Sequence, residues 1–274
     1  MRRLVFLIQV SRPIVWPVLP LVYYLGLHAA DAPLSIAAII QMASLTLPMN
    51  LIGCGLNDLY DHESDRRSRR RRAVWGATLG DADRPLVWRA AVLMVPIVLL
   101  AAAATRNAYN LAATVCLVVA AWLYSVPPVR LKERPPLDSL ANGLGYFLLP
   151  LAMGYSLGRD PSTMPLRFYL LALCVCGVHA LATAADYEAD KAAGHRTLAV
   201  RFGRRTAAAV AFATFTVAWL AADFESAAVR VYVAACTLTT FTAMLIPIDK
   251  VISLACVAIF AGFLIAGACH AYGW

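Results

Sequence analysis

The sequence predicts an all-α polytopic membrane protein, and two observations carry that prediction. Hydrophobic residues make up 61% of the 274 residues and charged residues only 15%, while the mean hydropathy is +0.68. These values exclude an ordinary water-soluble domain. The apolar residues also gather into nine segments, each near the roughly 20 residues that a helix needs to cross the hydrocarbon core. We therefore expect one transmembrane domain covering residues 1–274.

The nine expected transmembrane helices are residues 11–30, 34–56, 87–105, 108–126, 139–158, 166–185, 206–222, 228–246 and 251–271. The first opens with Arg12-Pro13 and has Pro17 and Pro20 close behind, so it should be kinked or begin late, since proline removes a backbone donor. Because the Arg12-Pro13 pair interrupts the apolar N-terminus, we interpret this end as retained rather than as a signal peptide. The last three segments carry few polar residues and are expected to wall a central, lipid-accessible cavity.

Positive charge is distributed unevenly between the two ends of these segments. Of the 24 lysines and arginines, 20 lie on one side, and loops rich in these residues stay in the cytoplasm. This asymmetry places the N-terminus and the polar motifs described below on the cytoplasmic face of a bacterial-type cell membrane, and Trp274 outside. The formal net charge of +8 is thus a signal of topology. We expect membrane lipids, and no nucleic acid, as the partner of the basic loops.

A polar motif, Asn57-Asp58-Leu59-Tyr60-Asp61-His62-Glu63-Ser64-Asp65, follows directly on the second apolar segment. If that helix continues, Asn57, Asp61 and Asp65 fall on one face at i, i+4 and i+8, with Asp58 at its side. Clustered carboxylates repel one another and are tolerated together mainly when a cation neutralises them. Oxygen donors of this kind suit Mg²⁺, which binds substrate phosphates at the same time. We therefore predict a magnesium site at the end of this helix.

A second acidic motif, Asp186-Tyr187-Glu188-Ala189-Asp190, follows the sixth apolar segment. Its two aspartates are also spaced i, i+4, which places them on one face if the helix continues. Two carboxylate clusters at two helix ends would suit two metal ions on either side of one diphosphate.

Three basic residues are candidates for diphosphate binding. Arg130 and Lys132 follow the turn Tyr124-Ser125-Val126-Pro127-Pro128, whose double proline ends a helix and stiffens the loop. Arginine and lysine are the usual partners of diphosphate oxygens. Arg12 either extends to lipid headgroups or faces the same phosphate. The six arginines in residues 66–72 are interpreted as an anchor to anionic lipid, although one or two could reach a diphosphate.

Two further polar residues have structural interpretations. Asp138, four residues before Asn142 at the start of the fifth segment, is interpreted as a helix cap, with a place in the cavity wall as the alternative. His195, in the loop after the second acidic motif, is interpreted as a surface residue rather than a catalytic one.

These motifs together resemble the UbiA superfamily of intramembrane prenyltransferases. The family pattern is N-D-x-x-D-x-x-x-D, a Y-S-x-P-P turn and a second D-x-x-x-D motif, and all three occur here in that order. The resemblance covers nearly the whole chain, including the nine helices. Residues 10–16, 57–67 and 128–144 look most like the bacterial lycopene elongases, which make C50 carotenoids. Ser68 and the arginines that follow it depart from that branch.

The resemblance implies roles for individual residues. The residues that would hold Mg²⁺ against the prenyl diphosphate are Asn57, Asp61, Asp186 and Asp190, supported by Asp58 and Asp65. The diphosphate oxygens would be contacted by Arg12, Arg130 and Lys132. Tyr124 would lie close to the allylic carbon, where an aromatic face stabilises developing positive charge.

The predicted function is therefore Mg²⁺-dependent transfer of a prenyl group from an allylic diphosphate, dimethylallyl diphosphate or longer, to a lipophilic acceptor in the membrane. By resemblance the acceptor is a carotenoid polyene such as lycopene. The alternative acceptor is an aromatic or quinone precursor of the 4-hydroxybenzoate or naphthoate type. An ion-coupled transporter is a third interpretation, since intramembrane carboxylates mark ion paths, but carriers place such groups near the midplane rather than at helix ends.

Overall fold

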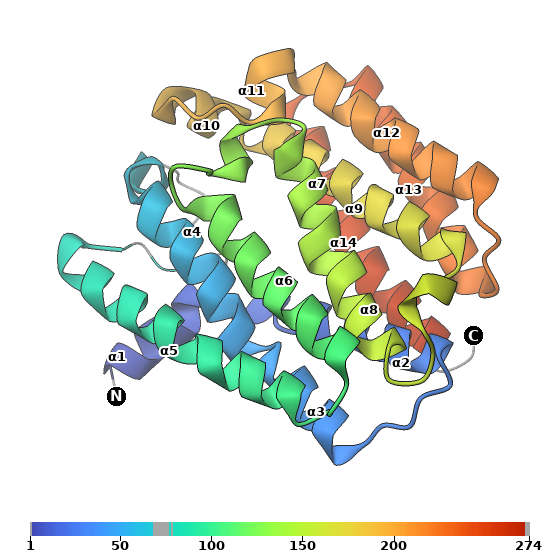
Figure 1. The fold of residues 1–274 in the computed structure, drawn as a ribbon. Helices are drawn as coiled ribbons and strands as arrows, with labels where there is room; N and C mark the ends of the chain where they lie inside the picture. The colour runs from blue at the N-terminus through green and yellow to red at the C-terminus, as the bar shows by residue number, and fades with distance from the viewer. Residues whose placement is uncertain (1, 68–76, 78, 272–274) are drawn as a thin grey trace. The chain divides into compact units, whose positions relative to one another are not determined.

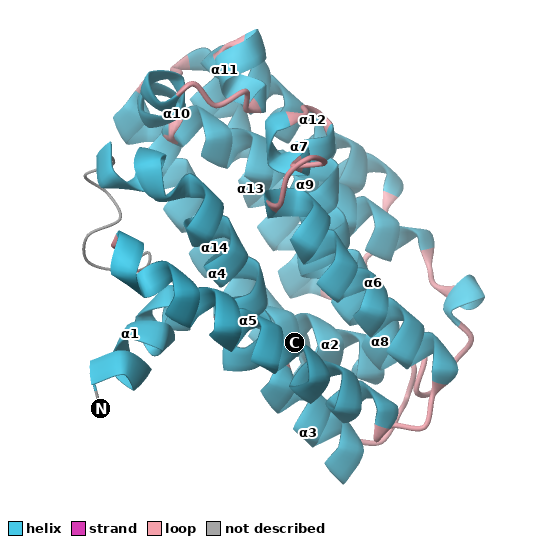
Figure 2. Cartoon of the chain, turned by 60° about the vertical axis from the view of Figure 1, so that its left-hand side comes forward, coloured by secondary structure: helices cyan, strands magenta, loops and turns pink. Residues whose placement is uncertain are grey.

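The computed structural model describes residues 2–67, 77 and 79–271, and within these ranges it contains helices and loops but no strand (Figures 1 and 2). Side chains are described for the same ranges except residues 62–67 and 271. The chain divides into two compact units. Unit 1 comprises Met1–Arg130 and Leu149–Thr163, and unit 2 comprises Leu131–Leu148 and Met164–Trp274.

Fourteen α-helices follow one another in the described part of the chain. They are α1 (Arg2–Val10), α2 (Val18–Ala29), α3 (Ile36–Ser44), α4 (Leu47–Arg67), α5 (Arg84–Ala103), α6 (Ala108–Ser125), α7 (Leu137–Gly143), α8 (Leu149–Tyr155), α9 (Leu166–Ala185), α10 (Tyr187–Ala193), α11 (Leu198–Phe202), α12 (Arg204–Ala221), α13 (Ala227–Leu245) and α14 (Asp249–Ala271). Side-chain caps begin three of the apolar helices: Ser35 for α3, Asn107 for α6 and Ser226 for α13. Each cap satisfies a backbone N–H that the helix leaves without a partner.

Six stretches of helix in the described residues are long and apolar enough to cross a membrane, which confirms an integral membrane protein. They are Ile36–Asp61, Asp81–Ala103, Ala108–Ser125, Leu166–Ala185, Ala227–Leu245 and Asp249–His270. A seventh span is obtained if Arg2–Val10 and Pro13–Ala29, which meet at a 49° bend, count as one. The bend lies at Ser11 and Arg12, where the sequence predicted a kink.

The prediction of nine spans is not confirmed, and two segments account for the difference. The segment predicted over 139–158 is broken into α7, a π-helical stretch over Leu144–Leu148, and α8. The segment predicted over 206–222 lies in α12, which begins with Arg204 and Arg205. Because two of its 18 residues are cations, this helix is less apolar than the six candidate spans.

Two glycines allow α2 and α8 to approach closely within unit 1. A Cβ atom on Gly154 would lie 2.0 Å from the carbonyl oxygen of Tyr23, and one on Gly26 would lie 2.1 Å from that of Leu151. Such contacts are shorter than any side chain tolerates, so both positions require glycine at this crossing. Small residues at helix crossings are typical of membrane proteins, where close backbone packing replaces the hydrophobic effect.

A buried polar network joins four helices of the same unit. The hydroxyl of Tyr23 on α2 donates to Gln41 Oε1 on α3 at 2.8 Å, and Gln41 Nε2 donates to Asn110 Oδ1 on α6 at 2.6 Å and to Thr114 at 3.1 Å. Asn110 Nδ2 then donates to the carbonyl of Met153 on α8 at 2.9 Å. The four polar side chains are fully buried. Since their groups are satisfied by one another, the network specifies the arrangement of α2, α3, α6 and α8.

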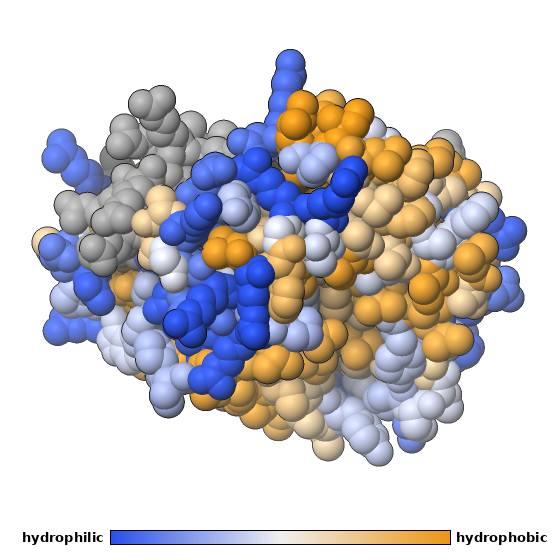
Figure 3. Space-filling view, turned by 90° about the horizontal axis from the view of Figure 1, so that it is seen from above, coloured by the Kyte–Doolittle hydropathy of each residue, from blue (hydrophilic) through white to orange (hydrophobic). Residues whose placement is uncertain are grey.

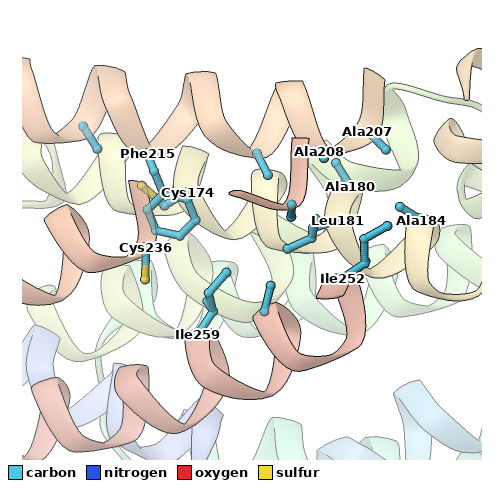
Figure 4. Close-up of a cluster of buried hydrophobic side chains, with 14 of the residues drawn as sticks. Cys174, Ala180, Leu181, Ala184, Ala207, Ala208, Phe215, Cys236, Ile252 and Ile259 are labelled. Carbon is cyan, nitrogen blue, oxygen red and sulfur yellow. The ribbon is translucent and has the colours of Figure 1, made fainter. Parts of the chain in front are cut away.

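Unit 2 is built around α9, which packs against α7, α11, α12 and α14. Its core contains Phe215, Leu181 and Ile252 with the buried thiols of Cys174 and Cys236 (Figure 4). No disulfide joins cysteines of the described residues, so these thiols act as small apolar packing groups.

Large apolar side chains reach the surface on many helices, as the orange atoms of Figure 3 show on one face. The most exposed include Ile36 (78%), Leu220 (72%), Leu238 (70%) and Leu100 (69%). A water-soluble monomer rarely exposes so much apolar surface. This surface suits contact with lipid chains.

Candidate functional site

Helix α4 continues without interruption through the first acidic motif. The sequence from Leu56 to Arg67 contains no glycine or proline, so nothing in it ends the helix. The predicted spacing is therefore confirmed: Asn57, Asp61 and Asp65 occupy positions i, i+4 and i+8 of one helix. Asn57 is partly buried and Asp61 is buried. The structure describes no side chain for Asp65 or for the arginines of residues 66–72.

Asp58 forms an ion pair with Arg12. The carboxylate oxygen Oδ1 accepts a hydrogen bond from Arg12 Nη2, and the Asp58 side chain is only 1% exposed, against 20% for Arg12. Arg12 lies in the break between α1 and α2, directly before the short helix Pro13–Val15. The proline that interrupts the first span therefore also brings Arg12 beside α4. The Arg12 guanidinium group therefore contacts a carboxylate of its own unit, and its contact with a phosphate stays a prediction.

Asp61 forms the second ion pair, with Arg130. Arg130 Nη2 donates to Asp61 Oδ1 at 3.2 Å and to the backbone carbonyl of Tyr60 at 3.4 Å. The side chains are 22% and 9% exposed, respectively. Arg130 follows the double-proline turn at the end of α6. Tyr124, in the last turn of α6, is partly buried.

Both arginines have a backbone conformation that residues with side chains seldom adopt. The φ angle is 54° at Arg12 and 42° at Arg130. Left-handed conformations of this kind cost about 1–3 kcal/mol each in a residue other than glycine and cluster at functional sites. Sequence reasoning missed this feature, because neither arginine lies in a motif for left-handed turns. Asp31 and Arg106 adopt the same conformation elsewhere, so the feature particular to Arg12 and Arg130 is their contact with carboxylates of α4.

The second acidic motif, in unit 2, spans a junction between two helices. α9 ends at Ala185 and α10 begins at Tyr187, so Asp186 caps both. The amide of Asp190 donates to the carbonyl of Asp186 at 2.9 Å, which confirms the i, i+4 spacing. Asp186 is exposed, and Asp190 is partly buried and accepts a hydrogen bond from Thr197 Oγ1 at 3.1 Å.

The loop after this motif is held by contacts that the sequence did not predict. His195 Nδ1 lies 2.8 Å from Glu133 Oε1, and its side chain is only 13% exposed, so the interpretation of His195 as a surface residue is wrong. Glu133 belongs to the short helix Leu131–Glu133, which also contains Lys132. Lys132 is buried, with 7% of its surface exposed. The histidine thus fixes the turn that carries one of the candidate diphosphate residues.

Asp138 caps a helix, although not the helix that contains it. Its Oδ2 accepts from the amide of Leu198, the first residue of α11, at 3.3 Å, and its Oδ1 accepts from the amide of Ser139 at 2.7 Å. Burial raises the pKa of the Asp138 carboxyl, and the N–H groups that it accepts oppose that rise. The carboxylate therefore attaches the loop of the second acidic motif to α7.

The donor types in both motifs fit Mg²⁺. Within the described ranges, no three side chains of His, Cys, Asp or Glu gather closely enough to hold a metal ion. Mg²⁺ does not require such a cage, because it is usually bound by one or two carboxylates together with substrate phosphates and water. Asn57 and Asp61 on α4, and Asp186 and Asp190 at the α9–α10 junction, supply hard oxygen donors of that kind.

Comparison with known proteins places the chain in a family. The model of the UbiA prenyltransferase family matches residues 14–271. A lycopene elongase/hydratase of Haloferax volcanii is 33% identical over 211 residues, which are 74% of this chain and 67% of that protein. The enzyme of the same description from Haloarcula japonica is 30% identical over 211 residues, which are 72% of this chain and 67% of that protein.

A solved structure has the same fold. A UbiA homologue from Archaeoglobus fulgidus, bound to DMAPP and Mg²⁺, matches with a TM-score of 0.68 at 21% identity. The match covers 94% of this chain and 98% of that one. The likeness shows a UbiA-like fold, and the described residues of this chain supply six or seven candidate spans to it.

Proposed function

The chain belongs to the UbiA prenyltransferase family, and from that premise we propose that it transfers a prenyl group from an allylic diphosphate to lycopene or a closely related polyene. The observation that carries the proposal is the set of two partly buried ion pairs on α4, Arg12 with Asp58 and Arg130 with Asp61. It combines oxygen donors for a divalent cation with guanidinium groups for a diphosphate. The names of the halophile relatives support lycopene as the acceptor.

Each polar residue has a proposed role in this reaction. The residues proposed to hold Mg²⁺ are Asn57, Asp61, Asp186 and Asp190, with Asp58 and Asp65 in support. Bound Mg²⁺ supplies positive charge that offsets the charge of the leaving diphosphate. The proposed diphosphate donors are Arg12, Arg130 and Lys132. Tyr124 would face the allylic carbon, where its ring stabilises the developing cation.

The two arginines differ in how readily they can exchange partners. The Arg130–Asp61 contact is 3.2 Å long and Arg130 shares its Nη2 with a backbone carbonyl, so a diphosphate can compete for this guanidinium group. Its withdrawal leaves the Asp61 carboxylate available to a metal ion. Asp58 is more deeply buried, so it remains beside Arg12 and supports the site through that arginine. Donors already positioned in a poorly solvated site stabilise charge without reorganisation.

Water must be excluded because it competes with the acceptor for the allylic cation. We propose that α7 with α8, and α12, complete the nine spans around a lipid-accessible cavity. The exposed apolar surface of both units supports access from lipid, since a polyene is itself an apolar solute of the bilayer. The charge asymmetry of the loops supports a cytoplasmic position for both acidic motifs.

The first test removes single carboxylates. Asp61→Asn and Asp186→Asn should each lower diphosphate release from dimethylallyl diphosphate by at least about 100-fold, because a metal contact in the transition state is worth several kcal/mol. The purified protein, in lipid nanodiscs with Mg²⁺ and lycopene, is assayed for diphosphate and for prenylated product. Asp223→Asn is the matched control, since the Asp223 side chain is 97% exposed.

Two outcomes contradict the proposal. If either variant turned over at nearly the wild-type rate at saturating Mg²⁺, the carboxylate changed in that variant would not be part of the site. If the protein prenylated 4-hydroxybenzoate or a naphthoate and left lycopene unchanged, the acceptor would be aromatic rather than a polyene.

A further inference from the structure

A histidine of an apolar span in unit 2 pairs with a serine of a neighbouring helix. Ser139 Oγ on α7 lies 3.1 Å from His179 Nδ1 on α9, and His179 belongs to the candidate span Leu166–Ala185. The proposed roles of the acidic motifs do not use either residue. Ionisable side chains within membrane spans are rare and commonly mark substrate paths or proton relays.

His179 belongs to the accessible stripe of α9. Val175, His179 and Ala182 are partly exposed and Asp186 is exposed, and their spacing places them on one face of the helix. The residues of α9 between them that are buried are Cys176, Gly177, Ala180, Leu181, Thr183 and Ala184. His179 lies seven residues before Asp186, which is about 10 Å along the helix axis at 1.5 Å per residue. The stripe therefore leads from the second acidic motif to the histidine.

The reaction proposed above needs a group that accepts a proton from the product cation. When the C–O bond of the allylic diphosphate breaks, its electron pair leaves with the diphosphate. The π electrons of the acceptor then form the new C–C bond, and the positive charge passes to an acceptor carbon. That cation either loses a neighbouring proton, whose C–H electrons form a double bond, or takes up a water molecule, which must itself lose a proton.

We propose that His179 accepts this proton, a role that rests on the proposed function. In the tautomer that donates Nδ1–H to Ser139 Oγ, the lone pair of the imidazole lies on Nε2. Ser139 is fixed in turn, because its amide donates to Asp138 Oδ1 at 2.7 Å. Ser139 is thus a positioning residue that orients the imidazole ring, and the proposed role uses the tautomer in which the Ser139 hydroxyl accepts. An imidazole held in this way is a general base, the commonest kind in enzymes.

Other polar groups of α9 are less suited to the role. Thr183 Oγ1 donates to the carbonyl of Ala180 at 2.7 Å and accepts from the amide of Ala199 at 3.2 Å. Cys176 Sγ donates to the carbonyl of Ala172 at 3.3 Å. Both side chains are buried and both bond to backbone groups, whereas His179 lies on the accessible stripe.

The competing interpretation is a structural hydrogen bond between α7 and α9. Such bonds between membrane helices contribute only modestly to stability. A structural role predicts that His179 and Ser139 variants lose stability together, with product composition unchanged. A proton-acceptor role predicts a change in what is made.

The test uses His179→Gln, His179→Ala and Ser139→Ala in nanodiscs, with Cys176→Ala as a control on a buried face of α9. Diphosphate release, prenylated product, the ratio of hydrated to deprotonated product, and the unfolding temperature are measured for each. We expect His179→Gln to lower kcat at least about tenfold and to shift the product ratio, with the KM for dimethylallyl diphosphate unchanged. Added imidazole should restore turnover to His179→Ala but not to wild-type protein or to Cys176→Ala.

The proposal and the function on which it rests can fail separately. A wild-type product ratio and kcat in both His179 variants would overturn the proton-acceptor role, as would a loss of activity that follows the unfolding temperature and resists imidazole. If the wild type prenylates an aromatic acceptor instead of lycopene, the proposed acceptor is wrong while the same variants still test His179, because a prenylated aromatic ring must also lose a proton.

Discussion

The ion pair between Arg12 and Asp58 should contribute far more to stability than an exposed ion pair of the same chemistry. The Asp58 side chain is 1% exposed and that of Arg12 20%, so little water screens their attraction. Unit charges about 4 Å apart attract by ~4 kcal/mol at an effective dielectric constant of about 20, and removing one partner of a buried pair costs about 3–5 kcal/mol. Because part of Arg12 remains solvated, we expect Asp58→Asn to lower the free energy of unfolding by about 2–3 kcal/mol.

A double-mutant cycle isolates the interaction. Asp58→Asn, Arg12→Gln and the double variant form one cycle, and the corresponding changes at Asp31 and Arg159 form the control. The control pair is 2.5 Å long, but its side chains are 80% and 52% exposed. We expect a coupling energy of about 2 kcal/mol for the buried pair and less than about 1 kcal/mol for the exposed pair.

Unfolding in mixed micelles, followed by the loss of helical signal, supplies the free energies for both cycles. Equal coupling energies in the two cycles would refute the conclusion that burial sets the strength of the Arg12–Asp58 pair. A coupling near zero in both would show in addition that Arg12 has an equivalent partner when Asp58 is changed.

Three further predictions follow from the packing, the protonation and the charge balance. Gly154→Ala should lower the free energy of unfolding by about 1–3 kcal/mol, because its Cβ would lie 2.0 Å from the Tyr23 carbonyl oxygen and force α2 and α8 apart. Burial raises the pKa of Asp138 in the folded protein. The protonated Asp138 carboxyl therefore contributes stability below pH about 4, and this contribution is lost as the pH rises through the pKa of the folded protein. When the free energy of unfolding is measured against pH, the wild type should lose stability over this range relative to Asp138→Asn. Removing Mg²⁺ with EDTA should abolish diphosphate release and leave the unfolding temperature unchanged.

Predictions from the sequence were most accurate where a single helix determines the spacing of the side chains. The spacing of Asn57 and Asp61 depends only on whether α4 continues, and the absence of glycine and proline after Leu56 decided that. The same reasoning located six spans to within a few residues. It failed for 139–158, because composition does not reveal that a π-helical stretch breaks the segment into two short helices.

Contacts between distant parts of the chain could not be predicted from local patterns. Gln41 and Asn110 are single polar residues in apolar segments, and nothing in either segment indicates that they bond to one another at 2.6 Å. Asp138 was interpreted as the cap of the fifth segment, but its carboxylate instead accepts from the amide of Leu198, which lies 60 residues further along the chain. Each case depends on which helices pack together, and a single sequence does not contain that information.

The carboxylates of α4 show the same limit in a form that bears on function. Sequence reasoning held that clustered aspartates need a cation, and it assigned that cation to a metal. The structure pairs Asp58 and Asp61 with arginines of their own unit, so the fold neutralises them by itself. We therefore expect folding to be independent of Mg²⁺, whereas in the proposed reaction a diphosphate that draws Arg130 away would leave Asp61 with a charge that a divalent cation can balance. The left-handed backbone at Arg12 and Arg130 is a conformational cost that accompanies the contacts of both guanidinium groups with these carboxylates.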